Sequence, residues 1–83
     1  MSFNVRWHPK ARKFLRRLPL ELSKRIIKKI KEIKENPFRY IGHYEGKYYK
    51  LRIGDFRLLL DINFKNKTLL IEVLDKRGRV YKR

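Results

Sequence analysis

The sequence predicts an α+β fold: a small antiparallel sheet with an N-terminal helical hairpin packed on one of its faces, in the order β-α-α-β-β-β. Three observations predict it. Hydrophobic and polar residues alternate near the N-terminus and in three later stretches. Between them, two stretches carry hydrophobic residues at helical spacing, and the last three strands are joined by short links. The 83 residues, 42% of them hydrophobic, are expected to form one domain (1–83) with a small core.

The N-terminal elements are expected to be a strand and two helices. Residues 3–8 alternate as a short strand, with Phe3, Val5 and Trp7 on one face. A first helix is expected to begin at Pro9, because proline suits the first helical turn, and to end or kink at Pro19. The second helix is expected to run from Leu20 to Asn36-Pro37. Its apolar stripe comprises Leu22, Ile26, Ile27, Ile30 and Ile33.

The rest of the chain predicts the sheet. Residues 38–47 are expected to form a connection with at most a short extended piece. Three strands should follow, at 48–53, 56–63 and 68–74, with links short enough for antiparallel hairpins. A turn at Gly78 precedes a last extended segment through Val80 and Tyr81.

Charge is the strongest compositional signal. Lys and Arg number 24 against 8 Asp and Glu, which gives +16 at pH 7. Such an excess repels itself unless an anionic partner offsets it, so nucleic acid, an anionic membrane or an acidic protein are the candidates. A surface adapted to high temperature would ordinarily carry more Glu as well. A nucleic acid is the favoured partner.

Several classes are excluded or disfavoured by composition. The chain has no cysteine, which excludes disulfides, zinc–thiolate sites and thiol nucleophiles. Its two histidines, His8 and His43, are far apart and belong to no motif, so neither a metal nor a cofactor is expected. No apolar run is long enough to span a bilayer and no signal peptide is apparent, so a cytoplasmic location is expected.

The two central strands place three cations on one surface. Strand parity directs Tyr49, Leu51 and Ile53 toward the helices, and Phe56, Leu58, Leu60 and Ile62 likewise. The other face then carries Lys50, Arg52 and Arg57. A solvated basic face is the simpler interpretation, but a phosphate-binding face is favoured, since like charges this close repel unless a ligand offsets them. Tyr40, Tyr44, Tyr48 and Tyr49 are expected to be packing residues.

The stretches "YYKLRIGDFRLLLDI" and "LLIEVLDKRGRVYKR", behind a helical hairpin, resemble the RelE/ParE toxin superfamily, and most closely its RelE-type branch in archaea and bacteria. The resemblance covers essentially the whole chain. It implies an mRNA interferase of a type II toxin-antitoxin system. Such a toxin is a ribosome-dependent, metal-free endoribonuclease that cuts mRNA in the A site, where the RNA's own 2′-hydroxyl attacks the adjacent phosphate. Translation inhibition follows.

The resemblance also implies site residues. Lys50 and Arg52 match the paired basic residues of the family's second strand, and Arg57 matches an arginine at the scissile phosphate. Arg77 would support the leaving group and the charge of the transition state, and Tyr81 would stack on or orient a base. One departure matters: the usual pattern has two lysines, whereas Arg52 cannot release its proton. Lys50 is the candidate general base if the neighbouring cations disfavour its charged form; otherwise catalysis would rest on electrostatics alone and be slower.

A toxin of this kind implies an acidic cognate antitoxin, with which it would form a heterodimer or heterotetramer; its other partners would be mRNA on the ribosome and the rRNA around it. Two alternatives stay open. ParE-type relatives share the fold and inhibit DNA gyrase, and a plain RNA- or ribosome-binding module would use the same cations only to hold phosphates.

Overall fold

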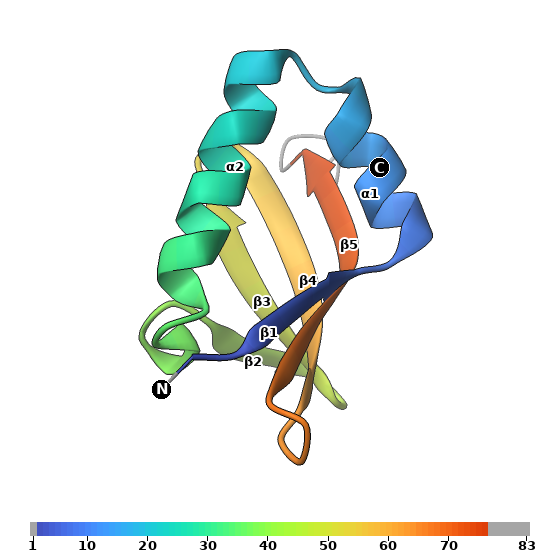
Figure 1. The fold of residues 1–83 in the computed structure, drawn as a ribbon. Helices are drawn as coiled ribbons and strands as arrows, with labels where there is room; N and C mark the ends of the chain where they lie inside the picture. The colour runs from blue at the N-terminus through green and yellow to red at the C-terminus, as the bar shows by residue number, and fades with distance from the viewer. Residues whose placement is uncertain (1, 77–83) are drawn as a thin grey trace.

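The computed structural model describes residues 2–76 and confirms the predicted α+β class (Figure 1). Two helices, α1 (Pro9–Arg17) and α2 (Leu20–Ile33), follow the first strand, β1 (Asn4–Trp7). A short 3-10 turn, η1 (Pro37–Arg39), leads to the remaining strands. These are β2 (Gly42–Glu45), β3 (Tyr48–Ile53), β4 (Phe56–Asn63) and β5 (Thr68–Lys76).

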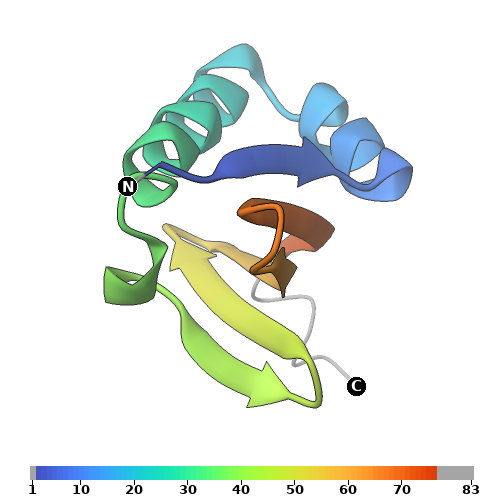
Figure 2. The ribbon, with the colours of Figure 1, turned by 60° about the horizontal axis from the view of Figure 1, so that its bottom comes forward.

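The sheet is mixed, which corrects the expectation of a purely antiparallel sheet. The strand order is β1-β5-β4-β3-β2, and Figure 2 shows the strands in this succession below the helices. All neighbours are antiparallel except β1 and β5, which run parallel with Asn4 opposite Thr68 and Trp7 opposite Ile71. The connection between these parallel strands contains both helices and the other three strands, far more than the dozen or so residues that a parallel pair requires. The extended piece allowed for within residues 38–47 is a full edge strand, β2.

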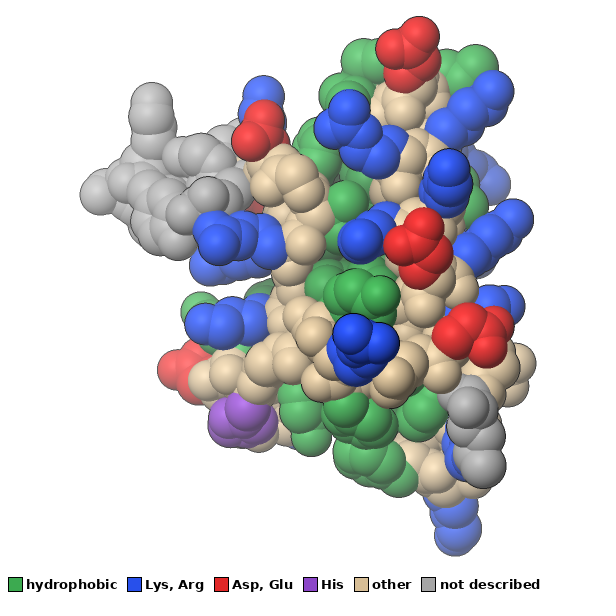
Figure 3. Space-filling view, turned by 90° about the vertical axis from the view of Figure 1, so that its left-hand side faces the viewer, with side chains coloured by type: hydrophobic (Ala, Val, Ile, Leu, Met, Phe, Trp, Pro, Cys, Tyr) green, Lys and Arg blue, Asp and Glu red, His purple; other side chains and the backbone are tan. Residues whose placement is uncertain are grey.

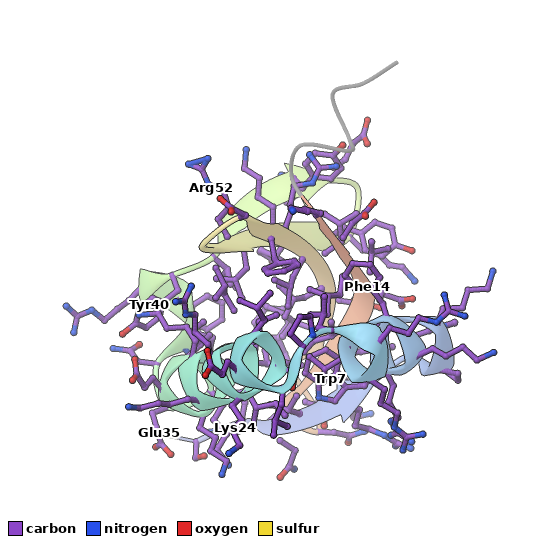
Figure 4. The ribbon with its side chains drawn as sticks, turned by 90° about the horizontal axis from the view of Figure 1, so that it is seen from above. Trp7, Phe14, Lys24, Glu35, Tyr40 and Arg52 are labelled. Carbon is purple, nitrogen blue, oxygen red and sulfur yellow. The ribbon has the colours of Figure 1, made fainter. Side chains whose placement is uncertain are left out.

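The core lies between the helices and one face of the sheet. The buried side chains alternate along β3 and β4 as parity predicts, and the helices contribute residues at helical spacing. In Figure 4, Phe14 points from α1 toward the sheet, and its ring meets Phe56 edge-on with centroids 6.4 Å apart. The buried set is Phe3, Ala11, Leu15, Ile26, Ile30, Ile33, Leu51, Ile53, Phe56, Leu58, Leu60, Ile62, Leu69, Ile71 and Leu74.

The predicted stripe of α2 was partly wrong. Ile26, Ile30 and Ile33 are buried, but Ile27 is exposed. The helix meets the sheet along a narrow line, so a residue one position off that line faces solvent. The helix also ends at Ile33 rather than at Asn36, since residues 34–36 form a turn before Pro37.

The hairpin of β3 and β4 matches its prediction residue for residue. Its corner depends on Gly54, whose φ of +58° is a conformation that glycine adopts without steric cost. The third predicted strand is longer than expected, because β5 continues to Lys76. No helix in residues 2–76 is long and apolar enough to cross a membrane.

Candidate functional site

The three cations predicted to share a face do lie together there. In the β3–β4 pairing, Arg52 is directly opposite Arg57, and Lys50 is opposite Leu59 two residues along the same face. Leu51 and Ile53, which alternate with them, are buried under the helices. Figure 4 shows Arg52 projecting from the sheet away from α1 and α2. The three positive charges therefore lie on the face that the helices leave open.

A cavity of about 330 Å³ opens beside these cations. Its walls come from β2, β3, β4 and the segment after η1, and its lining comprises Tyr40, Gly42, Tyr44, Lys50, Leu51, Arg52 and Arg57. Gly42 lies opposite Lys50 in the β2–β3 pairing, and a side chain added there would meet nothing within 4 Å. The cavity thus combines positive charge with aromatic surface, the combination that nucleic-acid sites use.

Tyr40 and Tyr44 are not packing residues, contrary to the prediction. They are 40% and 41% exposed, and both line the cavity. The Arg57 guanidinium lies over the Tyr44 ring, with its carbon 5.7 Å from the ring centroid. Lys29 of α2 lies 5.3 Å from the centroid of Tyr40. Both contacts have the geometry of cation–π interactions.

The other two tyrosines of the sheet behave differently. Tyr49 is half-buried and packs against the core, with its ring edge-on to His43 at 5.8 Å between centroids, so the packing prediction is confirmed for it. Tyr48 is half-buried outside the cavity, beneath the Lys47 ammonium at 5.5 Å. Lys47 also forms an ion pair with Asp61 at 3.4 Å.

A second basic groove adjoins the cavity. It runs between α2 and the end of β3, and is lined by Arg25, Lys28, Lys29, Glu32, Arg52, Ile53 and Gly54. Arg52 lines both the cavity and the groove, because β2 pairs with β3 only as far as Lys50 and leaves the end of β3 beside α2. Figure 3 shows Lys and Arg side chains gathered over this side of the molecule. The groove was not predicted from the sequence, because helix residues and strand residues meet there only in the fold.

Two predicted site residues, Arg77 and Tyr81, lie outside the described residues. The strand that leads to them ends beside the cation cluster, since Asp75 is opposite Arg57 in the β4–β5 pairing. The cluster therefore has a carboxylate on one side. Within residues 2–76, no three His, Asp or Glu side chains gather closely enough to hold a metal ion.

An open basic sheet face behind a helical hairpin defines a class of small toxins. A family model described as "ParE toxin of type II toxin-antitoxin system, parDE" matches residues 5–81. A curated Methanocaldococcus jannaschii protein, named as the toxin RelE1, is 30% identical over an alignment of 88 positions, which covers 99% of this chain and 98% of that protein. The chain therefore belongs to the ParE toxin family of the RelE/ParE superfamily, and is a toxin of the type II toxin-antitoxin class.

Solved structures agree with the fold. The chain resembles a toxin-antitoxin complex component, RelBE2 of Mycobacterium tuberculosis, with a TM-score of 0.84 and 23% identity over 93% of this chain and 100% of that one. A chain of the archaeal RelE–RelB complex from Pyrococcus horikoshii gives a TM-score of 0.77 and 26% identity, over 95% and 99% of the two chains. An Escherichia coli RelE mutant in the free state gives a TM-score of 0.78 and 18% identity, over 95% of this chain and 87% of that one.

Proposed function

We propose that this toxin is a ribosome-dependent mRNA endonuclease that cleaves in the A site and so inhibits translation. The single observation that carries the proposal is the meeting of Lys50, Arg52 and Arg57 beside an aromatic cavity on the open face. Their arrangement suits a phosphodiester: arginine forks bind phosphate oxygens in pairs, and a lysine adds a point charge or, when neutral, a base.

The proposed reaction is an internal transesterification. Lys50, as the general base, takes the proton of the RNA 2′-hydroxyl, the new O2′–P bond forms, and the P–O5′ bond breaks. The products are a 2′,3′-cyclic phosphate and a 5′-oxygen that takes up a proton to become a hydroxyl. Arg52 and Arg57 stabilise the charge that develops on the phosphate oxygens. Arg77 would support the leaving group, and Tyr81 would orient a base.

The basic groove along α2 supports an extended anionic substrate. Arg25, Lys28 and Lys29 continue the positive surface from Arg52 toward the helix. A nucleic acid places a phosphate at every nucleotide, so a chain held at the cavity can meet further cations in the groove. Both mRNA and rRNA could supply these phosphates.

A cognate antitoxin is the second proposed partner. RelE toxins of P. horikoshii and M. jannaschii were solved in complexes with RelB antitoxins. A chain with a net charge of +16 favours an acidic partner, and covering the open face would exclude RNA from the cation cluster. We therefore propose an acidic antitoxin that forms a heterodimer or heterotetramer with this chain.

Inhibition of DNA gyrase is a second candidate function, because the matching family model is named for ParE. The cation cluster favours RNA cleavage over it, since a protein that blocks an enzyme by binding needs no charges converging on a phosphate. A plain RNA- or ribosome-binding module stays the third candidate, since the same cations could hold phosphates without cleavage.

Cleavage of mRNA on programmed ribosomes tests the proposal. Wild type should cut within the A-site codon and leave a 2′,3′-cyclic phosphate, whereas Arg57→Ala should be about 100- to 1,000-fold slower, as expected when one donor to a transition-state oxyanion is removed. Lys65→Ala is the matched control, because Lys65 is an exposed cation in the turn between β4 and β5.

The three candidate functions give different outcomes. Cuts that map to translated codons after induced expression support the proposal. Intact mRNA together with loss of DNA supercoiling by purified gyrase supports the ParE-type function instead. Ribosome binding with neither effect supports the plain binding module, and equal cleavage by wild type and Arg57→Ala would contradict the proposed role of the cluster.

A further inference from the structure

Tyr44 has an exposure that neither core packing nor the predicted catalytic roles explain. Its ring is 41% exposed on a strand of only four residues, beside the three cations of the candidate site. With 41% of its surface in contact with water, Tyr44 gains less from burial than a core aromatic residue does. The position of the Tyr44 ring therefore indicates contact with a ligand rather than packing in the hydrophobic core.

The backbone of β2 directs this ring over the open face. Gly42 is opposite Lys50 on that face, and alternation returns Tyr44 to it. The pairing then shifts register between His43 and Glu45, so Tyr44 is the extra residue of a bulge opposite Tyr48. Bulges change where side chains point and are common next to active sites.

Arg57 connects the ring to the phosphate-binding cations. It belongs to β4, whereas Tyr44 belongs to β2, and β3 lies between them. Neighbouring strands are about 4.8 Å apart, so the side chains of Arg57 and Tyr44 must together reach across β3 to make their contact. Together they therefore pass over the surface that carries Lys50 and Arg52. The ring and the three cations line one cavity.

We infer that Tyr44 is the nucleobase-stacking surface of the candidate site, so that the cavity binds one nucleotide by its base as well as its phosphate. The inference rests on the proposed function and extends it. A phosphate and its base are attached to the same sugar, so a site with cations on one side needs a flat apolar surface beside them to hold the base. Because every base has a stacking face, this contact adds affinity with little sequence preference.

Tyr40 is the other aromatic residue of the cavity, and it suits this role less well. Its cationic neighbour is Lys29 of α2, rather than a member of the cation cluster. Figure 4 shows Tyr40 beside the end of α2. Tyr44, in contrast, is in contact with Arg57, the residue proposed to hold the scissile phosphate.

Binding to RNA with and without a base tests this role. The probe is a short single-stranded RNA whose 2′-oxygens are methylated against cleavage, paired with the same strand carrying an abasic sugar at one position. Wild type should bind the complete strand roughly 5- to 150-fold more tightly, the range expected for one stacked base. Tyr44→Leu should lose this preference. Tyr44→Phe should keep it, and Tyr44→Trp should strengthen it.

Tyr48→Leu is the matched control, because Tyr48 also lies beneath a cation, Lys47, but outside the cavity. It should retain the preference of wild type. A base preference that survives in Tyr44→Leu, that is lost in Tyr40→Leu instead, or that wild type does not show would overturn the inference. If Tyr44→Leu does not fold, an unchanged preference in Tyr44→Trp would overturn it as well.

These results are separable from those that test cleavage. Wild type that shows a Tyr44-dependent base preference but never cuts mRNA on ribosomes would contradict the proposed function and support the stacking role. If wild type cuts mRNA normally while Tyr44→Leu keeps the base preference, the proposed function is supported and the stacking role of Tyr44 is contradicted.

Discussion

The two faces of one sheet carry opposite chemistry on alternating residues of the same strands. Under the helices, Leu51, Ile53 and Leu58 are buried among apolar side chains. On the open face, Lys50, Arg52 and Arg57 occupy the intervening positions. Since neighbouring residues share the backbone that holds them, the apolar core holds the cations in register, although like charges placed so close repel one another. Along these strands, residues that stabilise the fold alternate with residues that line the candidate site.

The largest effect is expected at Lys50, on the open face. If its amine is the general base, both Lys50→Ala and Lys50→Arg should slow cleavage by about 100- to 10,000-fold, because arginine keeps the charge but cannot accept the proton. Single-turnover cleavage on programmed ribosomes measures this. Lys50→Arg should still bind RNA as wild type does. A Lys50→Arg variant that cleaves as fast as wild type would show that charge alone suffices.

The next largest effect contrasts adjacent leucines of β4. Leu58 is fully buried and Leu59 faces the open side. Leu58→Ala should lower the free energy of unfolding by about 2–5 kcal/mol, because apolar burial is removed and a cavity is left behind. Leu59→Ala should cost less, about 1–2 kcal/mol, since Leu59 is half-buried and part of its surface stays in contact with water. Urea denaturation measures both. Similar decreases for the two variants would contradict the assignment of the faces.

A smaller effect is expected in the groove along α2. Replacing Arg25 and Lys28 by Gln should weaken the binding of single-stranded RNA and lower the slope of log affinity against log salt by about 0.7 for each RNA phosphate that is no longer neutralised. The matched control replaces Lys10 and Lys13 of α1 by Gln, which removes the same charge from exposed positions outside the groove. An equal change in slope for both pairs would mean that overall charge, and not the groove, attracts RNA.

The smallest effect contrasts two glycines. Gly54→Ala should destabilise the fold by about 1–2 kcal/mol, because alanine is strained at a φ of +58°. The added methyl group itself meets only Arg25, at 3.8 Å. At Gly42 the added methyl group would meet open space, and the backbone φ is not positive. The unfolding free energy of Gly42→Ala should therefore stay within about 0.5 kcal/mol of wild type. Thermal unfolding compares them, and a larger destabilisation at Gly42 would contradict this account.

The sequence predicted the hairpin of β3 and β4 well because its signals are local. Alternation over two strands and a Gly54-Asp55 corner are enough to assign the faces, and hence to bring Lys50, Arg52 and Arg57 together. The pairing of β1 with β5 was not predicted, because no local pattern records a partner at the other end of the chain. Ile27 was misassigned since spacing alone does not reveal how narrow the contact of α2 with the sheet is.

The aromatic half of the site was also missed. Gly42 and Gly46 flank a short extended stretch and could have indicated a further hairpin, with Gly46 at a φ of +57°. Without the β2–β3 register, however, the side on which Tyr44 lies could not be assigned. The groove of Arg25 and Arg52 depends on how a helix lies against a strand end, which is tertiary information.

The parallel pairing of β1 with β5 has a consequence for synthesis of the chain. Asn4 is made long before its neighbour in the sheet, Thr68. A strand pair separated by most of the sequence can close only after the later strand has left the ribosome, and the long loop makes it a late step. Until then, β1 has no neighbouring strand with which to pair. The sheet is therefore complete only after β5 has been made and has left the ribosome.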